Sequence, residues 1–172
     1  MAESGGENDT LSNMKWILSI LLGFAPAFAV DAPAPSVFTM PTQFQRVVIV
    51  RLKHQTDILE GLKEAVAREK IKNAVILSGF GSVISYHIHV VNNTTFPPKD
   101  VFAQEKGAFD ILTVSGLVMD GRVHPHISLS SPQKTIGGHI EPGTQVMTFA
   151  TITLGVLPDS VDLKRMDDWN WH

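Results

Sequence analysis

Apolar and polar residues alternate strictly over residues 83–91, which is the period of a β-strand with one buried face. Tyr86 and Ile88 point to one side of this segment. His87 and His89 point to the other side. Runs rich in β-branched and apolar residues predict further strands at 46–52, 74–78, 109–119, 123–130 and 146–157. We therefore expect strands to dominate the chain.

One segment instead repeats its apolar residues at helical spacing. Asp57 and Glu60 form an Asp-x-x-Glu capping box, which predicts a helix that begins there and ends at about Lys70. The apolar face of this helix is made by Ile58, Leu62, Ala65 and Val66. A helix with one apolar stripe buries it against another element, so we expect this one to pack on the sheet.

Turn residues separate the predicted strands. Residues 79–82 predict a glycine-rich turn, and residues 92–100, with two Thr and two Pro, predict a loop. Shorter turn signals are Asp120-Gly121, Ser131-Pro132 and Glu141-Pro142-Gly143. We predict an α+β fold, with one main helix on a twisted, largely antiparallel sheet of six or more strands.

Composition excludes several classes of function. The 172 residues suit a single domain. Acidic residues outnumber basic ones by 17 to 14, and the basic residues are scattered, which argues against nucleic-acid binding. The chain has no cysteine, so disulfides, thiolate metal sites and thiol nucleophiles are excluded. Any bound metal must therefore be held by His, Asp or Glu.

The first 29 residues have the pattern of a secretory signal. Lys15 precedes the apolar stretch Trp16–Phe24 and then Ala27-Phe28-Ala29, which predicts cleavage after Ala29 and a secreted or periplasmic protein. A start at Met14 would make the signal more conventional, and a buried or amphipathic helix is the alternative. The apolar stretch is too short to span a bilayer comfortably, so we expect no membrane span in the mature chain. The remaining divisions are a linker at 30–45, a domain at 46–158 and a tail at 159–172.

Three histidines form the candidate site. His124 and His126 are two residues apart on a predicted strand, so their side chains share a face, with Cβ atoms about 6–7 Å apart. His139 follows the turn at residues 131–135 and returns to that face if the chain doubles back as a hairpin. Three imidazoles without a thiolate suit zinc, with iron, nickel or copper as alternatives, and leave one coordination position open. Two exposed histidines without a metal would show the same spacing, so both interpretations remain.

The neighbours of these histidines add further expectations. Pro125 would deprive a central strand of a hydrogen bond, which predicts a sheet edge or a bulge. The glycines at 137–138 leave room for a ligand or an ion to approach His139. His87 and His89 have no third partner in the sequence. We interpret them as residues of a polar face, with an accessory or interfacial metal contact as the alternative.

Two short segments carry the most specific pattern in the chain, Gly121-Arg-Val-His-Pro-His-Ile-Ser-Leu129 and Ile136-Gly-Gly-His-Ile140. Together with Ser78-Gly-Phe-Gly-Ser82 and Gly107-Ala-Phe-Asp-Ile-Leu112, they resemble the plants and prokaryotes conserved (PPC) domain family over about residues 46–157. The resemblance implies an α/β domain with a largely antiparallel sheet that assembles as a homotrimer. It also implies that His124, His126 and His139 match the metal-binding histidines of prokaryotic members.

Three hypotheses about function follow. The first is an exported, trimeric metal-binding and interaction module. The second is a metal-dependent hydrolase or lyase for a small carbonyl compound or ester, because the fold also resembles acetolactate decarboxylase and a zinc-dependent ester hydrolase. Asp110 and Glu141 are then candidates for proton transfer, and Arg122 for holding an anionic substrate. Thr151 stands where many family members carry Glu, which weakens this hypothesis. The third is a DNA-associated regulator like the plant members, but the chain has no Arg-Gly-Arg-Pro segment.

The C-terminal tail ends in a segment with two indole side chains. A fully solvated tail would not need them. We predict that Trp169 or Trp171 docks on the chain's own sheet or on a neighbouring subunit, with a disordered tail as the alternative.

Overall fold

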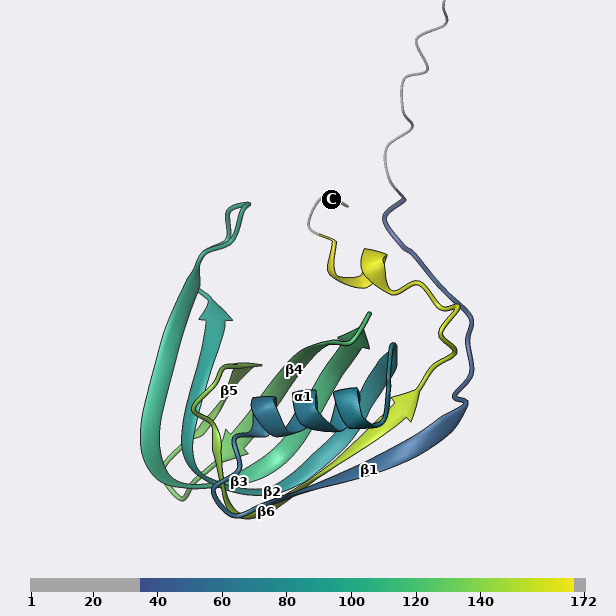
Figure 1. The fold of residues 1–172 in the computed structure, drawn as a ribbon. Coiled ribbons are helices and arrows are strands. Elements are labelled where there is room, and N and C mark those ends of the chain that lie inside the picture. The colour runs from purple at the N-terminus through teal and green to yellow at the C-terminus, as the bar shows by residue number, and fades with distance from the viewer. Residues whose placement is uncertain (1–34, 169–172) are drawn as a thin grey trace, which may run out of the picture. The chain divides into compact units, whose positions relative to one another are not determined.

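The computed structural model describes residues 35–168, which belong to one compact unit (Figure 1). The predicted signal pattern and the docking prediction for Trp169 and Trp171 lie outside the described residues. No helix within residues 35–168 is long and apolar enough to cross a bilayer. The elements in chain order are β1 (Arg46–Lys53), α1 (Ile58–Arg68), β2 (Ala74–Val91), β3 (Asp100–Met119), β4 (Arg122–Ser130), β5 (Thr135–Ile140), β6 (Gln145–Val156) and the 3-10 helix η1 (Lys164–Asp167).

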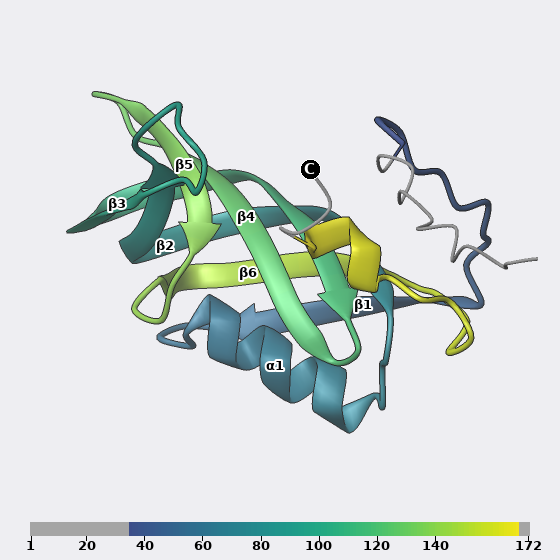
Figure 2. The same cartoon turned by 90° about the horizontal axis from the view of Figure 1, so that it is seen from above.

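The strands form one six-stranded antiparallel sheet in the order β1-β6-β2-β3-β4-β5. β5 pairs a second time, with β2, where Ile88 lies opposite Ile140 and His89 lies opposite His139. The sheet therefore curls back on itself at this end, where β5 lies across β2 and β4 (Figure 2). A six-stranded antiparallel sheet with one α-helix agrees with the α+β arrangement predicted from the sequence.

Helix α1 packs in the curve of the sheet (Figure 1). The Asp57 carboxylate accepts a hydrogen bond from the backbone N–H of Glu60 at 3.0 Å, as the capping box predicted. The helix ends at Arg68, slightly earlier than expected. Its apolar face is buried as predicted, and Ile58 and Leu62 are fully inaccessible to solvent. The core between helix and sheet also contains Val50, Leu52, Val83, Val114, Leu129, Ile140, Ile152 and Leu154.

The glycine-rich segment at 79–82 is not a turn, contrary to the sequence prediction. β2 runs through it without interruption, although its pairing with β6 shifts register between Gly81 and Val83. Gly81 has φ +140°, and a Cβ there would lie 2.1 Å from the carbonyl oxygen of Phe149 on β6. Glycine is needed because the neighbouring backbone passes this close, so the segment bends a long strand instead of ending it.

β3 and β4 also differ from the prediction, β3 in where it begins and β4 in its place in the sheet. β3 begins at Asp100 instead of residue 109, because it continues its pairing with β2 as far as Val91. β4 is not an edge strand, since it lies between β3 and β5. Its pairing with β5 starts only at His126, so Pro125 precedes the paired stretch, and β5 does not require the N–H that proline lacks. The predicted hairpin between β4 and β5 is present, closed by Ser130 opposite Thr135.

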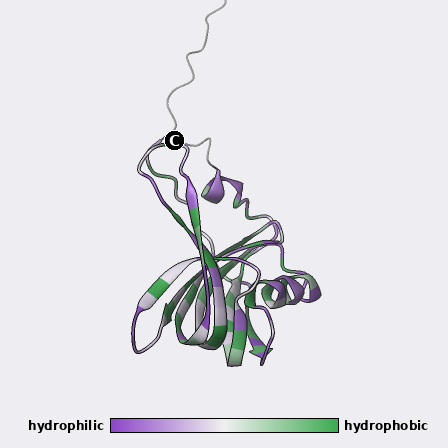
Figure 3. Cartoon of the chain, turned by 90° about the vertical axis from the view of Figure 1, so that its left-hand side faces the viewer, coloured by the Kyte–Doolittle hydropathy of each residue, from purple (hydrophilic) through white to green (hydrophobic). Residues whose placement is uncertain are grey.

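Apolar and polar positions alternate along the strands (Figure 3). The sheet face away from α1 nevertheless exposes large apolar side chains on β1, β2 and β3, although β6 lies between β1 and β2. Ile49 is 70% exposed, and Phe80 and Leu112 are each 55% exposed. Val47 and Leu77 are also exposed. We call these five residues the outer apolar patch. Several exposed apolar side chains on one sheet face are typical of a surface that another protein covers.

Candidate metal centre

The three histidines predicted from the sequence come together on neighbouring strands. His124 and His126 lie two residues apart on β4, and His126 pairs directly with His139 on β5. The Nε2 atoms of His124 and His126 are 3.3 Å apart, and one nitrogen from each of the three rings lies within 4.8 Å of the other two. The His139 ring stands edge-on to the other two, with centroid distances of 4.6 Å to His124 and 5.2 Å to His126.

These distances suit a single small cation. With zinc–nitrogen bonds of about 2.05 Å in tetrahedral geometry, two nitrogen ligands stand about 3.3 Å apart. The Nε2 atoms of His124 and His126 already have this separation. Three imidazoles are also a donor set that zinc accepts without any thiolate. The residues present therefore fit a divalent transition metal, with one coordination position beyond the three rings.

The glycines before His139 allow the neighbouring strands to lie close together. A Cβ on Gly137 would lie 2.6 Å from the carbonyl oxygen of Ile127 on β4, and one on Gly138 would lie 2.5 Å from that of His89 on β2. Any larger residue would push β5 away from both neighbours. The two glycines thus let β5 lie close enough to β2 and β4 to bring His139 among the other histidines.

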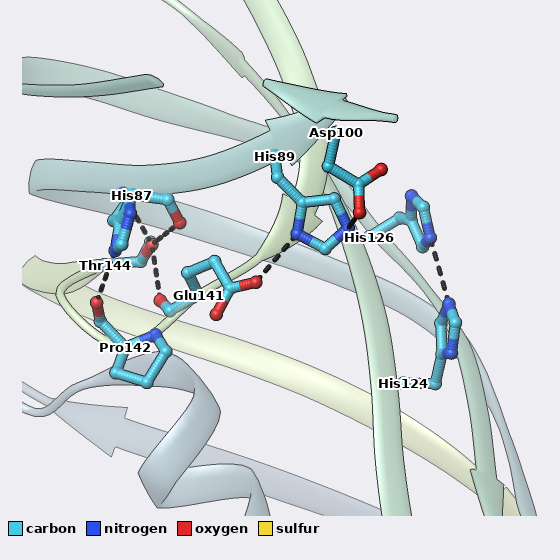
Figure 4. A network of polar contacts seen from close by, with 8 residues as sticks. All are labelled: His87, His89, Asp100, His124, His126, Glu141, Pro142 and Thr144. Atoms are coloured by element: carbon cyan, nitrogen blue, oxygen red, sulfur yellow. Dashed lines mark hydrogen bonds and ion pairs between the residues drawn. The ribbon is translucent and has the colours of Figure 1, made fainter. Parts of the chain in front are cut away.

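A fourth histidine joins this cluster from β2. The His89 ring stacks on the His139 ring at a centroid distance of 4.6 Å, and its Nδ1–H donates to Glu141 Oε1 at 2.7 Å (Figure 4). His89, His139 and Glu141 make a second group whose donor atoms all lie within 4.8 Å of one another. His89 Nε2 lies 4.0 Å from Asp100 Oδ2. The sequence interpretation of His89 as a polar-face residue missed these contacts.

His87 has a different environment from His89, although the two residues form one H-x-H pair. Its Nδ1–H donates to the backbone carbonyl of Pro142 at 2.9 Å, and it belongs to neither group of clustered donors (Figure 4). The backbone N–H of His87 donates to the hydroxyl of Thr144. Only the His89 member of the pair therefore extends the candidate centre.

An aspartate from the C-terminal segment supports the His124 ring. Asp167 Oδ2 accepts a hydrogen bond from His124 Nδ1–H at 3.2 Å and one from Arg122 Nη2 at 2.5 Å. The Asp167 side chain is only 20% exposed. No pattern in the sequence indicated this contact, because 43 residues separate Asp167 from His124 and no periodic pattern covers η1.

Burial and mutual repulsion keep two of the rings neutral near pH 7. Burial, with the neighbouring His124 and His89 rings, lowers the pKa of His139 to about 4. Burial and the His124 ring also lower the pKa of His126. Neutral imidazoles keep a nitrogen lone pair for a metal. Burial acts to raise the pKa of Asp167, but the bonds from Arg122 and His124 outweigh burial and hold that pKa below its usual range.

The structure places the three predicted catalytic candidates at different distances from the histidines. Glu141 lies in the histidine cluster, within 4.8 Å of a His139 nitrogen. Arg122 lies beside the cluster but is paired with Asp167. Asp110 lies elsewhere, because the register of β3 places Ser115, not Asp110, opposite His126. Five residues of strand put Asp110 about 16 Å farther along the sheet, so the structure does not bring it to the histidines.

The fold and this site define a small antiparallel α+β domain with a cluster of histidines on its curled edge. Residues 40–158 match the Plants and Prokaryotes Conserved (PCC) domain, the family called PPC above. The chain belongs to this family, as the sequence resemblance predicted. It is also 29% identical, over 126 residues, to the bifunctional protein GlmU of a Synechococcus strain. The match covers 73% of this chain and 19% of that protein, so the chain spans about a fifth of its length.

Solved structures share the fold. A metal-containing protein from Archaeoglobus fulgidus superimposes with a TM-score of 0.60 at 20% identity, over 70% of this chain and 86% of that protein. A PPC protein from Pyrococcus horikoshii gives a TM-score of 0.59 at 21% identity, over 73% of this chain and 89% of that one. At this level of identity the likeness concerns the fold alone.

Proposed function

We propose that this PCC-domain protein holds one divalent transition metal, zinc, through His124, His126 and His139, and serves as a metal-binding and interaction module. The observation that carries the proposal is the convergence of three imidazole nitrogens within 4.8 Å, two of them at the 3.3 Å separation that suits a tetrahedral site. A metal held by three protein ligands supplies a Lewis-acid centre with a coordination position for a small-molecule ligand.

The chain's own residues prepare this site before any ligand arrives. Cross-strand pairing fixes His126 beside His139, so neither ring depends on a loop for its position. The lowered pKa values of these two histidines keep their nitrogens unprotonated at neutral pH, which removes proton competition for the metal. The description of the Archaeoglobus fulgidus protein as metal-containing adds support from the same fold.

Elemental analysis of the purified full chain tests the proposal. We expect one zinc per chain in the wild type and none in His126→Ala, which removes the ring of an exposed residue. His54→Ala is the matched control, because His54 is an exposed histidine that bonds to the Met147 carbonyl and belongs to neither donor group. Equal zinc in the wild type and in His126→Ala would refute the site.

We also propose that the protein is a homotrimer. The outer apolar patch supports an assembly, since its large side chains are more exposed than a monomer in water would favour. Light scattering after gel filtration measures the mass directly. We expect three copies in the wild type and a smaller species for Ile49→Asp, which adds a charge to the most exposed residue of the patch. A monomeric wild type would contradict the proposal.

We propose, from the sequence pattern of residues 1–29, that the protein acts outside the cytoplasm. The lack of cysteine is compatible with an oxidising compartment, because no thiol is present to oxidise. Expression of the full chain followed by N-terminal sequencing of the product tests this proposal. A mature protein that begins at Val30 is expected. A product that stays intact in the cytoplasm would contradict it.

A second candidate function is a metal-dependent hydrolase or lyase for a small ester or carbonyl compound. One observation favours it. Glu141 is a carboxylate within the histidine cluster, and His89 holds it by a 2.7 Å hydrogen bond in a site that is only partly open to solvent. A carboxylate paired with an imidazole at this distance can accept a proton and pass it on, which is the role such chemistry requires.

Turnover assays separate the second candidate from the first. A zinc-loaded wild type that hydrolyses small esters, together with a Glu141→Gln variant that keeps its zinc and loses about 10²- to 10⁴-fold in turnover, would establish it. If turnover of esters and of small oxo and hydroxy acids does not exceed that of the zinc-free protein, the metal-binding and interaction module remains the supported function.

A further inference from the structure

The 3-10 helix η1 lies beyond residues 40–158, the part of the chain that matches the family. Its last residue, Asp167, nevertheless touches the candidate metal centre. The segment before it is anchored to the domain: Leu163 is buried against Met119 and Leu157, and the Asn73 side-chain amide donates to the Val161 carbonyl at 2.7 Å. This anchoring fixes the place from which Asp167 reaches the sheet.

The chemistry of the contact dictates how the His124 ring is used. An ionised carboxylate only accepts hydrogen bonds, so the nitrogen that faces Asp167 must carry the proton. That nitrogen is Nδ1. A neutral imidazole with its proton on Nδ1 has its lone pair on Nε2, and Nε2 is the atom that stands 3.3 Å from His126 Nε2. The carboxylate thus selects the tautomer and the ring orientation that turn His124 toward the other two histidines.

Arg122 makes this arrangement more definite. Its guanidinium donates to the same Asp167 oxygen that His124 uses, and so helps to fix that oxygen in place. The two donors lie on one face of β4, two residues apart, and both reach toward η1. Because one oxygen serves both, replacement of the carboxylate removes the orienting acceptor of His124 and the partner of Arg122 together.

We propose that Asp167 is a positioning residue of the metal centre, and that the C-terminal segment from residue 159 to residue 168 is consequently part of that centre. This inference rests on the proposed metal site at His124, His126 and His139. Carboxylates that receive the second N–H of a metal-binding histidine raise its basicity and fix its ring. Because coupling between two binding events is reciprocal, the metal should in turn stabilise the docking of η1.

Zinc titration of the full chain, in competition with a chelator of known affinity, tests the proposal. We expect Asp167→Asn to weaken zinc binding by about 10- to 100-fold, because the amide can no longer act only as an acceptor toward Nδ1–H. The matched control is Asp162→Asn, in the same segment, whose carboxylate caps the backbone N–H of Lys164 and touches no histidine. Its zinc affinity should equal that of the wild type.

A second measurement follows the docking of η1 directly. Zinc should slow hydrogen exchange at the backbone amides of residues 163–167 in the wild type, and should have a much smaller effect on these amides in Asp167→Asn. Unchanged zinc affinity in Asp167→Asn, or no slowing in the wild type, overturns the inference. The proposed metal site fails separately: its failure appears as a wild type without zinc, or as zinc retained in His126→Ala, whatever Asp167→Asn does.

Discussion

Replacement of Gly116 by alanine should damage both the fold and the metal centre, and the structure allows the size of the effect to be worked out. Gly116 lies on β3 opposite Pro125, the residue between His124 and His126. Its φ is +135°, and a Cβ there would lie 2.1 Å from the carbonyl oxygen of His124. Real Cβ contacts stay above 3.0 Å, so this carbonyl must retreat by about 1 Å.

Two costs combine in this variant. A backbone conformation that only glycine adopts freely costs a substituted residue about 1–3 kcal/mol. Displacement of a packed neighbour costs about 1–3 kcal/mol more. We therefore expect Gly116→Ala to lower the free energy of unfolding by about 2–6 kcal/mol in urea titrations. Zinc affinity should fall as well, because the displaced carbonyl belongs to His124 itself.

Gly121→Ala separates the two costs. Gly121 also has a positive φ, +79°, but a Cβ there would meet nothing within 4 Å. It should therefore show only the conformational cost, about 1–2 kcal/mol, and an unchanged zinc affinity. Equal losses of stability in the two variants would refute the reasoning, since displacement of the His124 carbonyl by the added Cβ would then cost no free energy.

Two further predictions concern the metal-free protein and the core. The pKa of His139 in the folded protein, about 4, lies below its ordinary value of 6.5, so the unfolded chain binds the proton more readily. The contribution of this residue to the free energy of unfolding is therefore complete above pH 6.5 and is lost as the pH falls toward 4. Solvent screening of this half-buried ring reduces the loss to about 1–2 kcal/mol, and urea titrations of chelator-treated protein at pH 7 and pH 4.5 should show it, with a weaker dependence in His139→Gln. Ile152 is fully buried, so Ile152→Ala should cost about 2–5 kcal/mol and Ile152→Val about 0.5–1.5 kcal/mol; equal costs in the two variants would mean that the site collapses without a cavity.

Local patterns in the sequence were sufficient for much of the fold. The Asp57 cap, the buried face of α1 and the hairpin that returns His139 toward His126 all depend on residues close in sequence, and all are present. The bent path of β2 through Gly81 was not predictable in this way. A glycine cluster has the same appearance in a turn and in a strand that another backbone approaches closely, and only the position of β6 distinguishes them.

The candidate site was predictable only in part, for a related reason. His124, His126 and His139 share a hairpin, so their meeting follows from local geometry. His89 enters because β5 pairs a second time, with β2, and Asp167 enters because η1 folds back over β4. The opposite holds for Asp110. It is a carboxylate near the histidines in sequence, but the register of β3 carries it away from them. Register and long-range docking are properties of the assembled sheet, which periodicity does not encode.

The groups of the candidate metal centre are held in two different ways, and this decides which of them can change without damage to the sheet. Rings that project from paired strands are held by the backbone, and Gly116, Gly137 and Gly138 allow that backbone to be packed unusually closely. These closely packed strands fix the positions of the histidine nitrogens. They leave little freedom to adjust those positions, since any side chain added at these glycines moves a whole strand. The basicity and orientation of the rings must then be adjusted by side chains that reach them from outside these strands. Asp167 is such a group, and it lies in a segment that the family match does not include. We therefore expect that, at the proposed metal site, a change at Asp167 alters metal affinity with less damage to the sheet than a change at one of these glycines.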